Sequence, residues 1–375
     1  PARGAEPGMR SIFRTTHKYL GLTFGILWLL QVLTGVLLVF NGEIDDALLR
    51  GPDRALAPAA FAAAASELAA ARPNQTLTYV MASEGSPNRY DLLFTDKDDH
   101  TRSVRVDGQG SVLRERPRDY DYPAPGIFQT AHDFHETLFA GDRGKWFLGL
   151  SGLLLLSNLL LGLNLAWPGR GQPWSRVLRP GNAGPAAVKF FKWHRALGVC
   201  VLLPAIVMVA CGVLQQWPPD EWLGVADSAP TPHQSTQAEF IPLAVALPAA
   251  LARYPGASLA IIRMPDADQP WYRVRLRQSG ELRRVFGQTT VYVDARDGAV
   301  LRDSDAFKLP LNERIVNAIY PIHSGEAFGI GGRLVVLLTG LSLLAMGVLG
   351  AGMWWTRRAA RSASKRTQSP AMVQR

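Results

Sequence analysis

The sequence predicts an α-helical integral membrane protein: a four-span bundle made of two parallel repeats. Each repeat consists of a span, a small external α+β domain and a second span. Three observations predict this fold: four blocks of 22 residues contain no Asp, Glu, Lys, Arg or His, basic residues gather in the segments on one side of these blocks, and the second half of the chain repeats the first. A disordered chain or an ordinary soluble enzyme is excluded, since neither carries such blocks.

The apolar blocks are long enough to cross a bilayer. They are Tyr19–Phe40, Trp146–Trp167, Ala196–Trp217 and Leu334–Trp355. About 20 apolar residues in a helix span a hydrocarbon core of roughly 30 Å, and tryptophans at the block ends are typical of the membrane interface. The first block is too long for the apolar region of a signal peptide, and no Ala-x-Ala cleavage site follows it, so we expect it to be retained.

The distribution of charge predicts the orientation. Segments 1–18, 168–195 and 356–375 carry 16 basic residues and one acidic residue, whereas segments 41–145 and 218–333 carry 24 basic and 30 acidic residues. By the positive-inside rule, we expect both termini and the 168–195 loop in the cytoplasm and the two long segments outside. The net charge of +9 is therefore a topology signal and does not indicate nucleic-acid binding.

The two halves of the chain repeat motif by motif. His17-Lys-Tyr-Leu-Gly matches His194-Arg-Ala-Leu-Gly at an offset of 177, and the stretch from His135 matches the stretch from His323 at an offset of 188, with identical glycine spacing. Both halves begin on the inside, so the repeat is parallel. Equivalent residues of the two halves should therefore lie at the same membrane depth.

These patterns predict the domain boundaries. They are an N-terminal tail (1–10), a first span (11–41), a first external domain (42–127), a second span with its His-bearing approach (128–167), a cytoplasmic loop (168–192), a third span (193–217), a second external domain (218–312), a fourth span with its approach (313–356) and a basic tail (357–375). In the external segments, composition and alternation predict a helix at 61–72 with strands at 76–81, 90–94 and 103–106, and a helix at 244–254 with strands at 258–263, 271–276 and 290–294.

Five of the seven histidines lie at the ends of spans. His17 and His194 begin spans one and three, while His135 and His323 precede spans two and four. Because the members of each pair share a depth, their imidazoles can approach one iron from opposite sides as axial ligands of haem. We therefore predict two haem b groups, one near each face of the membrane.

Other interpretations of the histidines stay open. Interfacial histidines that cap helices and contact lipid headgroups need no cofactor, and a metal site without haem usually takes three or more ligands. His132 lies one helical turn before His135, and its counterpart is Tyr320, so it is an alternative ligand, a propionate partner or part of a substrate site. Lys145 and Arg333 are further candidate partners of haem propionates.

Together these motifs resemble one known family. The His-[Lys/Arg]-x-Leu-Gly motif at a span start, His135 before span two and the paired external α+β domains are similar to the PepSY-associated transmembrane family over roughly residues 10–358. Within it, the chain most resembles ferric-siderophore reductases of the FoxB type. The resemblance implies PepSY-like external domains in a bacterial inner-membrane protein. It also implies haem-dependent transfer of electrons from a cytoplasmic or quinol donor to a ferric siderophore, of the hydroxamate type, whose iron is reduced from Fe³⁺ to Fe²⁺ and released in the periplasm.

Aromatic residues near the external mouth are candidate substrate contacts. They are Tyr120, Tyr122, Phe128 and Trp271. A Tyr-Pro-rich linker without a binding role is the alternative for the two tyrosines.

Two other functions compete with the reductase. One is a haem-free membrane-anchored module that binds, inhibits or senses, and the other is a siderophore or iron permease. The absence of charged residues inside the four apolar blocks argues against the permease. Bound haem would separate the reductase from both.

Overall fold

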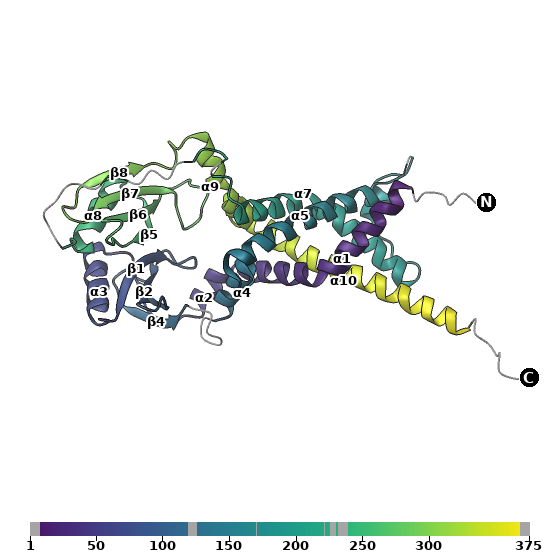
Figure 1. Cartoon of the computed structure of the whole chain (residues 1–375), viewed down its shortest axis with the longest axis horizontal. Coiled ribbons are helices and arrows are strands. Elements are labelled where there is room, and N and C mark those ends of the chain that lie inside the picture. The colour runs from purple at the N-terminus through teal and green to yellow at the C-terminus, as the bar shows by residue number, and fades with distance from the viewer. Residues whose placement is uncertain are drawn as a thin grey trace, which may run out of the picture. The chain divides into compact units, whose positions relative to one another are not determined.

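The computed structural model describes residues 8–118, 126–169, 171–220, 222–225, 230–231 and 239–367, with side chains up to residue 362. By its internal contacts the chain divides into two units. The helical unit comprises Pro1–Val36, Phe134–Trp217 and Leu334–Arg375, and the sheet unit comprises Leu37–Asp133 and Pro218–Arg333. Figure 1 labels the helices and strands of both units.

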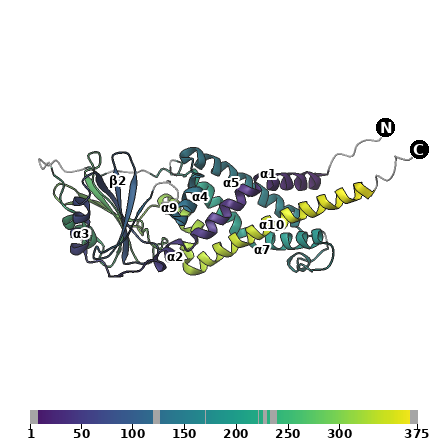
Figure 2. The ribbon, with the colours of Figure 1, turned by 90° about the horizontal axis from the view of Figure 1, so that it is seen from below.

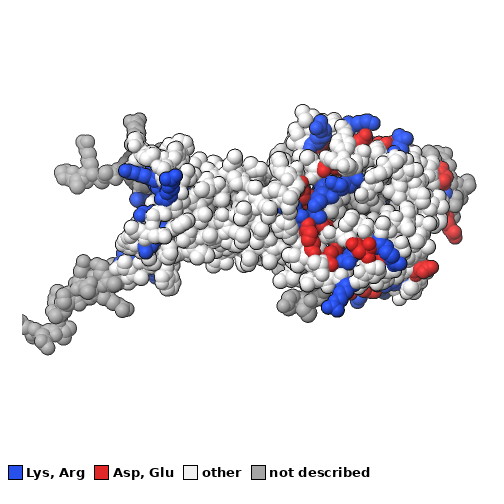
Figure 3. Space-filling view, turned by 180° about the vertical axis from the view of Figure 1, so that it is seen from behind, with Lys and Arg blue, Asp and Glu red and all other residues white. Residues whose placement is uncertain are grey.

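Four long helices carry the predicted spans. They are α1 (Met9–Leu38), α5 (Gly141–Ala166), α7 (Ala186–Gln216) and α10 (Gly329–Thr367). Each covers one apolar block to within two residues of its end and is long and apolar enough to cross a bilayer, so the prediction of a membrane protein with four spanning helices is confirmed. The surface of these helices is almost free of charge along its length, and Lys and Arg gather at one end of it (Figure 3).

The helical unit differs from the prediction at three places. α7 begins at Ala186, within the loop that was expected to extend to residue 192. α10 continues to Thr367, past the expected start of the basic tail at residue 357, because arginine and alanine are strong helix formers. A short helix that was not predicted, α6 (Ser175–Leu178), lies in the loop between α5 and α7.

Glycines allow the spans to pack closely in a repeated pattern. A Cβ atom added to Gly152 of α5 would lie 2.5 Å from Val213 of α7, and one added to Gly340 of α10 would lie 2.5 Å from Val36 of α1. Such distances are too short for any side chain, so glycine is required at both contacts. Gly152 and Gly340 correspond at the offset of 188, and Val36 and Val213 correspond at the offset of 177. The same contact therefore occurs in both halves.

Eight antiparallel strands form one sheet, in the order β4-β3-β2-β1-β5-β6-β7-β8. Figure 2 labels β2 of this sheet. The strands are β1 (Gln75–Ala82), β2 (Arg89–Asp96), β3 (Thr101–Asp107), β4 (Val112–Pro117), β5 (Ser258–Arg263), β6 (Trp271–Arg277), β7 (Thr289–Asp294) and β8 (Val300–Ser304). The six predicted strands are confirmed. The prediction missed β4 and β8, because these edge strands are short and rich in charged residues, as edge strands often are.

The central strand pair β1–β5 joins the two halves of the sheet. The paired residues are Tyr79 with Arg263, Val80 with Ile262 and Met81 with Ile261. The sequence predicted two separate small domains, whereas the structure has a single sheet. Each half-sheet would otherwise leave β1 or β5 as an open edge with unpaired backbone groups, and the pairing satisfies both edges.

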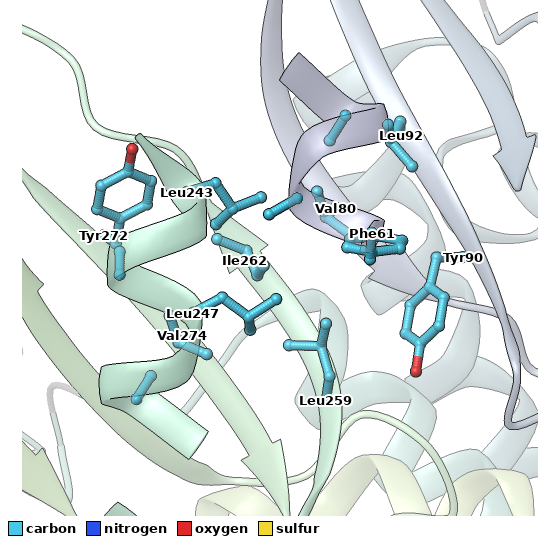
Figure 4. Packing of buried hydrophobic residues seen from close by; sticks show 14 of the residues in the cluster. Phe61, Val80, Tyr90, Leu92, Leu243, Leu247, Leu259, Ile262, Tyr272 and Val274 are labelled. Atoms are coloured by element: carbon cyan, nitrogen blue, oxygen red, sulfur yellow. The ribbon is translucent and has the colours of Figure 1, made fainter. Parts of the chain in front are cut away.

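Two helices cover one face of the sheet and build its core. They are α3 (Pro58–Ala70) and α8 (Leu243–Arg253). Phe61 and Leu247 from these helices and Val80 and Ile262 from the central strands are completely buried, and Figure 4 shows them in one cluster. The remaining helical segments are α2 (Asn41–Ala47), α4 (Ile127–Thr137), α9 (Leu311–Ser324) and the 3-10 turn η1 (Glu326–Phe328).

The other face of the sheet carries a buried ion-pair network in the first half. Arg105 of β3 lies 2.7 Å from Asp91 of β2 and 3.5 Å from Asp45 of α2, and it also pairs with Asp46. The Arg105 side chain is 7% exposed, and those of Asp46 and Asp91 are 6% and 16% exposed. The network therefore ties α2 to the strands at a site that excludes most solvent.

This network predicts that the sheet unit loses stability in acid. Burial opposes the ionisation of Asp91, but the charge and hydrogen bonds of Arg105 outweigh it and lower the pKa of Asp91. A carboxylate with a lowered folded pKa stabilises the fold above its unfolded pKa of about 3.9, and this stabilisation is lost as the pH falls through the folded value. Hydrogen exchange in β2 and β3, corrected for intrinsic rates, should stay slow down to about pH 5 and rise below about pH 4. Unchanged protection at about pH 2 would contradict this.

Candidate functional site

Two of the predicted histidines meet inside the helical unit. His17 lies on α1 and His194 on α7. Their ring centroids are 6.2 Å apart, and their planes are rotated by 74°. The two imidazoles come from equivalent positions of the two halves, as the offset of 177 predicts.

A backbone carbonyl of a neighbouring span orients each of these rings. His17 Nδ1 lies 3.1 Å from the Asn158 carbonyl of α5, and His194 Nδ1 lies 2.9 Å from the Met346 carbonyl of α10. A carbonyl oxygen can only accept, so each Nδ1 carries the proton and each Nε2 keeps its lone pair. An imidazole held in this way has the tautomer that binds a metal through Nε2.

A glycine also makes room for each ring. It lies four residues after the residue that supplies the carbonyl, on the same helix as that residue. A Cβ atom at Gly162 would lie 3.3 Å from His17 Cε1, and one at Gly350 would lie 3.7 Å from His194 Cε1. Asn158 and Gly162 correspond to Met346 and Gly350 at the offset of 188. The carbonyl and the glycine therefore form one arrangement that occurs in both halves.

His135 has the same surroundings, built by α1. Its Nδ1 lies 3.0 Å from the Gln31 carbonyl and 3.1 Å from Thr34 Oγ1. A Cβ atom at Gly35 would lie 3.0 Å from His135 Cε1. Gln31 and Gly35 are again four residues apart, so His135 also holds its proton on Nδ1 and keeps Nε2 as an acceptor.

The other two histidines of interest lie in the sheet unit. His323 is near the end of α9, which a left-handed Gly325 terminates with a φ of 81°. His132 lies on α4 with a side chain that is 53% exposed, and its Nδ1 is 3.4 Å from Asp133. His132 is thus placed near solvent, one turn of helix before His135.

The spacing of the His17–His194 pair suits a metal ion between two imidazoles. Two metal–nitrogen bonds of roughly 2.0–2.1 Å, with roughly 1 Å from each nitrogen to its ring centre, give a centroid separation of roughly 6 Å. The observed value is 6.2 Å. Among the described residues, no group of three or more His, Cys, Asp or Glu could hold a metal ion. Two protein ligands suffice for haem, because the porphyrin supplies the others.

The predicted propionate partners both have protein acids beside them. Arg333 pairs with the Glu43 carboxylate, 2.8 Å from Nη2 to Oε2, and donates to the Val39 carbonyl. Lys145 Nζ lies 3.8 Å from Glu136. At the basic end of the helical unit, Arg195 donates to the Ala166 carbonyl at 2.7 Å.

The predicted substrate residues are scattered. Tyr120 and Tyr122 lie outside the described residues. Phe128 is half-buried on α4. Trp271 begins β6 with only 7% of its surface exposed, so little of the ring is available to a ligand.

An open depression of about 500 Å³ lies in the sheet unit, and the sequence did not reveal it. It is lined by Thr78, Tyr79, Met81, Leu93, Thr95, Thr101, Arg118, Gln129, Asp133 and Ile261. These residues belong to β1, β2, β3, β5 and α4, and Arg118 directly follows β4. Because they are spread along the sequence, no local motif predicts the depression. Gln129 and Asp133 belong to α4, the only helix that contributes to this lining among the described residues.

A family model described as the PepSY-associated TM region matches residues 14–357. No curated protein sequence matches the chain.

Proposed function

The chain belongs to the PepSY-associated TM family, and from this premise we propose that it is a di-haem b reductase that passes electrons across a membrane to a ferric siderophore. The observation that carries the proposal is the His17–His194 pair, with centroids 6.2 Å apart. Both rings are held by backbone carbonyls in the tautomer that leaves Nε2 to a metal. When bound, haem b supplies a one-electron carrier within the bilayer.

We propose His135 and His323 as the ligands of a second haem. Support for His135 comes from its surroundings, because Gln31 and Gly35 repeat the carbonyl and glycine that hold His17 and His194. Support for His323 comes from the sequence, since it is the counterpart of His135 at the offset of 188. In this proposal His132 contacts the haem edge or the substrate and is not a ligand.

The proposed orientation puts the basic helix ends in the cytoplasm and the sheet unit in the periplasm of a bacterial inner membrane. A quinol or a cytoplasmic reductant would donate the electrons. The substrate would lie in the depression lined by Gln129 and Asp133. One electron converts its Fe³⁺ to Fe²⁺, which hard hydroxamate oxygens bind less well, so the iron is released. This is the activity of the FoxB-type reductases that the sequence resembles.

Absorption spectroscopy tests the proposal directly. The full chain, purified in detergent from cells with an adequate haem supply, should show a Soret band and, after dithionite, sharp α and β bands. Pyridine haemochrome assay should give about two haems per chain. A folded, monodisperse preparation without haem would exclude the reductase and favour the haem-free binding module.

Gly162 offers a graded test of the His17 site. A Cβ atom at Gly162 lies 3.3 Å from His17 Cε1, so Gly162→Ala requires a small shift of the ring and Gly162→Val a larger one. We expect the reduced α band of one haem to shift slightly in the alanine variant, and that haem to be lost in the valine variant. Leu160→Val, on the same helix but 55% exposed, is the control and should leave the spectrum unchanged. Wild-type spectra for both glycine variants would remove His17 as a ligand.

A further inference from the structure

Strand β6 presents a row of arginines on one face of the sheet. Arg273, Arg275 and Arg277 alternate with the core residues, so their side chains share the face opposite α3 and α8. Within residues 271–284 there are five arginines and one acidic residue, Glu281. The segment therefore concentrates positive charge at one place in the sheet unit.

The described partners of these arginines are neutral groups. Arg275 donates to the Gly287 carbonyl at 3.0 Å and to the Gln288 side chain at 2.9 Å. Arg277 donates to the Arg283 carbonyl at 2.9 Å.

Arg273, Arg275 and Arg283 are called the arginine cluster below. Two of its members contact aromatic rings and have a buried nitrogen atom. The Arg283 guanidinium lies 4.1 Å from the Tyr320 ring centre, and that of Arg273 lies 5.9 Å from the ring of Tyr292. In the part of the chain that the structure describes, Nε of Arg273 and Nε of Arg283 are buried and have no hydrogen-bond acceptor.

The acid within this segment, Glu281, forms its hydrogen bonds with other groups. Glu281 accepts hydrogen bonds from the Gln278 backbone at 2.9 Å and the Thr289 hydroxyl at 2.8 Å, and also from the Gln288 backbone. Burial, together with the positive charges of Arg283 and Arg273, lowers the pKa of Arg275 to about 10. The arginines thus repel one another more than Glu281 attracts them.

The first half of the sheet shows that the fold does not require this charge. Aligning Tyr90 with Tyr272 places Asp91 of β2 at the position of Arg273. There, Arg105 is neutralised by carboxylates within 3.5 Å. Among the described residues Arg273, Arg275 and Arg283 form no ion pair, although Glu281 lies near Arg275. Partly buried charges without an ion-pair partner cost stability, so their presence in only one half indicates a ligand that supplies the negative charge.

We infer that Arg273, Arg275 and Arg283 form a binding site for a small organic anion with more than one carboxylate. Guanidinium groups match the two oxygens of a carboxylate, and the buried Nε atoms of Arg273 and Arg283 are free to donate. Ile261, which pairs directly with Arg275 across β5 and β6, also lines the depression of about 500 Å³. Arg275 therefore lies next to a residue that lines a space able to take the organic body of such an anion. The proposed function places its substrate in the same depression, but the anion site is inferred from the arginines and does not depend on bound haem.

Calorimetric titration of the full chain in detergent with citrate tests this inference. Citrate should bind at millimolar or lower concentration, and Arg273→Gln and Arg283→Gln should each weaken binding about tenfold or more, because each removes a charged donor. Arg253→Gln is the matched control: Arg253 pairs with Asp303 at 3.0 Å, its side chain is 56% exposed, and its loss should not change citrate binding.

Two outcomes would overturn the inference. One is the absence of citrate binding, or citrate binding that is equal in the wild type and in both glutamine variants. The other is arginine-dependent binding of inorganic phosphate or of anionic-lipid vesicles with none of citrate, which would assign the site to phosphate groups. Because the titration needs no haem signal, a failed haem spectrum leaves the anion site standing, and a failed titration leaves the haem proposal standing.

Discussion

Replacing His194 by alanine is expected to lower the haem content from about two groups per chain to about one. His194 and His17 lie 6.2 Å apart between ring centres, each has its Nδ1 on a carbonyl, and in the proposed function the two rings bind the same haem. Removing one ring leaves the iron with a single protein ligand, and the remaining imidazole alone should not retain the haem through purification. The measurement is the pyridine haemochrome assay together with the reduced-minus-oxidised spectrum.

Controls make this result specific for the site. His100→Ala removes an exposed histidine of the sheet unit and should keep both haems. Gel filtration of each variant separates lost haem from lost folding, and His17→Ala should reproduce the spectrum of the His194 variant, since both disrupt the same pair. If His194→Ala retained both haems with unchanged bands, the assignment of this pair as ligands would be wrong.

The helices and strands were predictable because their residue patterns are local. Four charge-free blocks are sufficient to define the spans, and alternating apolar residues define the six inner strands. The single sheet was not predictable, because the pairing of Val80 with Ile262 joins strands that are far apart in the sequence. The residues of β1 and β5 do not show whether each strand pairs with the other half of the same chain or with a second molecule.

The His17–His194 pair was predictable from the repeat, but the way its two rings are held was not. The offsets of 177 and 188 identify His17 and His194 as equivalent. The partners of their Nδ1 atoms are the backbone carbonyls of Asn158 and Met346. Every residue has a backbone carbonyl, so a sequence pattern cannot identify these partners. Similarly, the ion pairs of Arg105 and the neutral hydrogen-bond partners of Arg275 depend on which side chains the sheet brings together.

Replacing Arg105 by methionine is expected to destabilise the sheet unit by about 3–5 kcal/mol, the usual effect of removing one member of a buried ion pair. Arg105 is the common partner of Asp45, Asp46 and Asp91, and its own side chain is 7% exposed. Without it, these buried carboxylates face one another with less compensating charge. Hydrogen exchange of the full chain, followed in peptides from β2 and β3, measures the loss.

Arg102 of the same strand provides the matched control for this substitution. Its side chain is 49% exposed and lies 3.9 Å from Glu115, so Arg102→Met should cost less than about 1 kcal/mol. The pH dependence then separates charge from packing. The Arg105 cation lowers the pKa of Asp91 although this carboxylate is buried, so the wild type loses stability as the pH falls. In Arg105→Met the carboxylates lack this cation, and the fold tolerates them better once they are protonated. The difference between wild type and Arg105→Met should therefore narrow below about pH 4, and a difference that stays constant with pH would mean that Arg105 acts through packing alone.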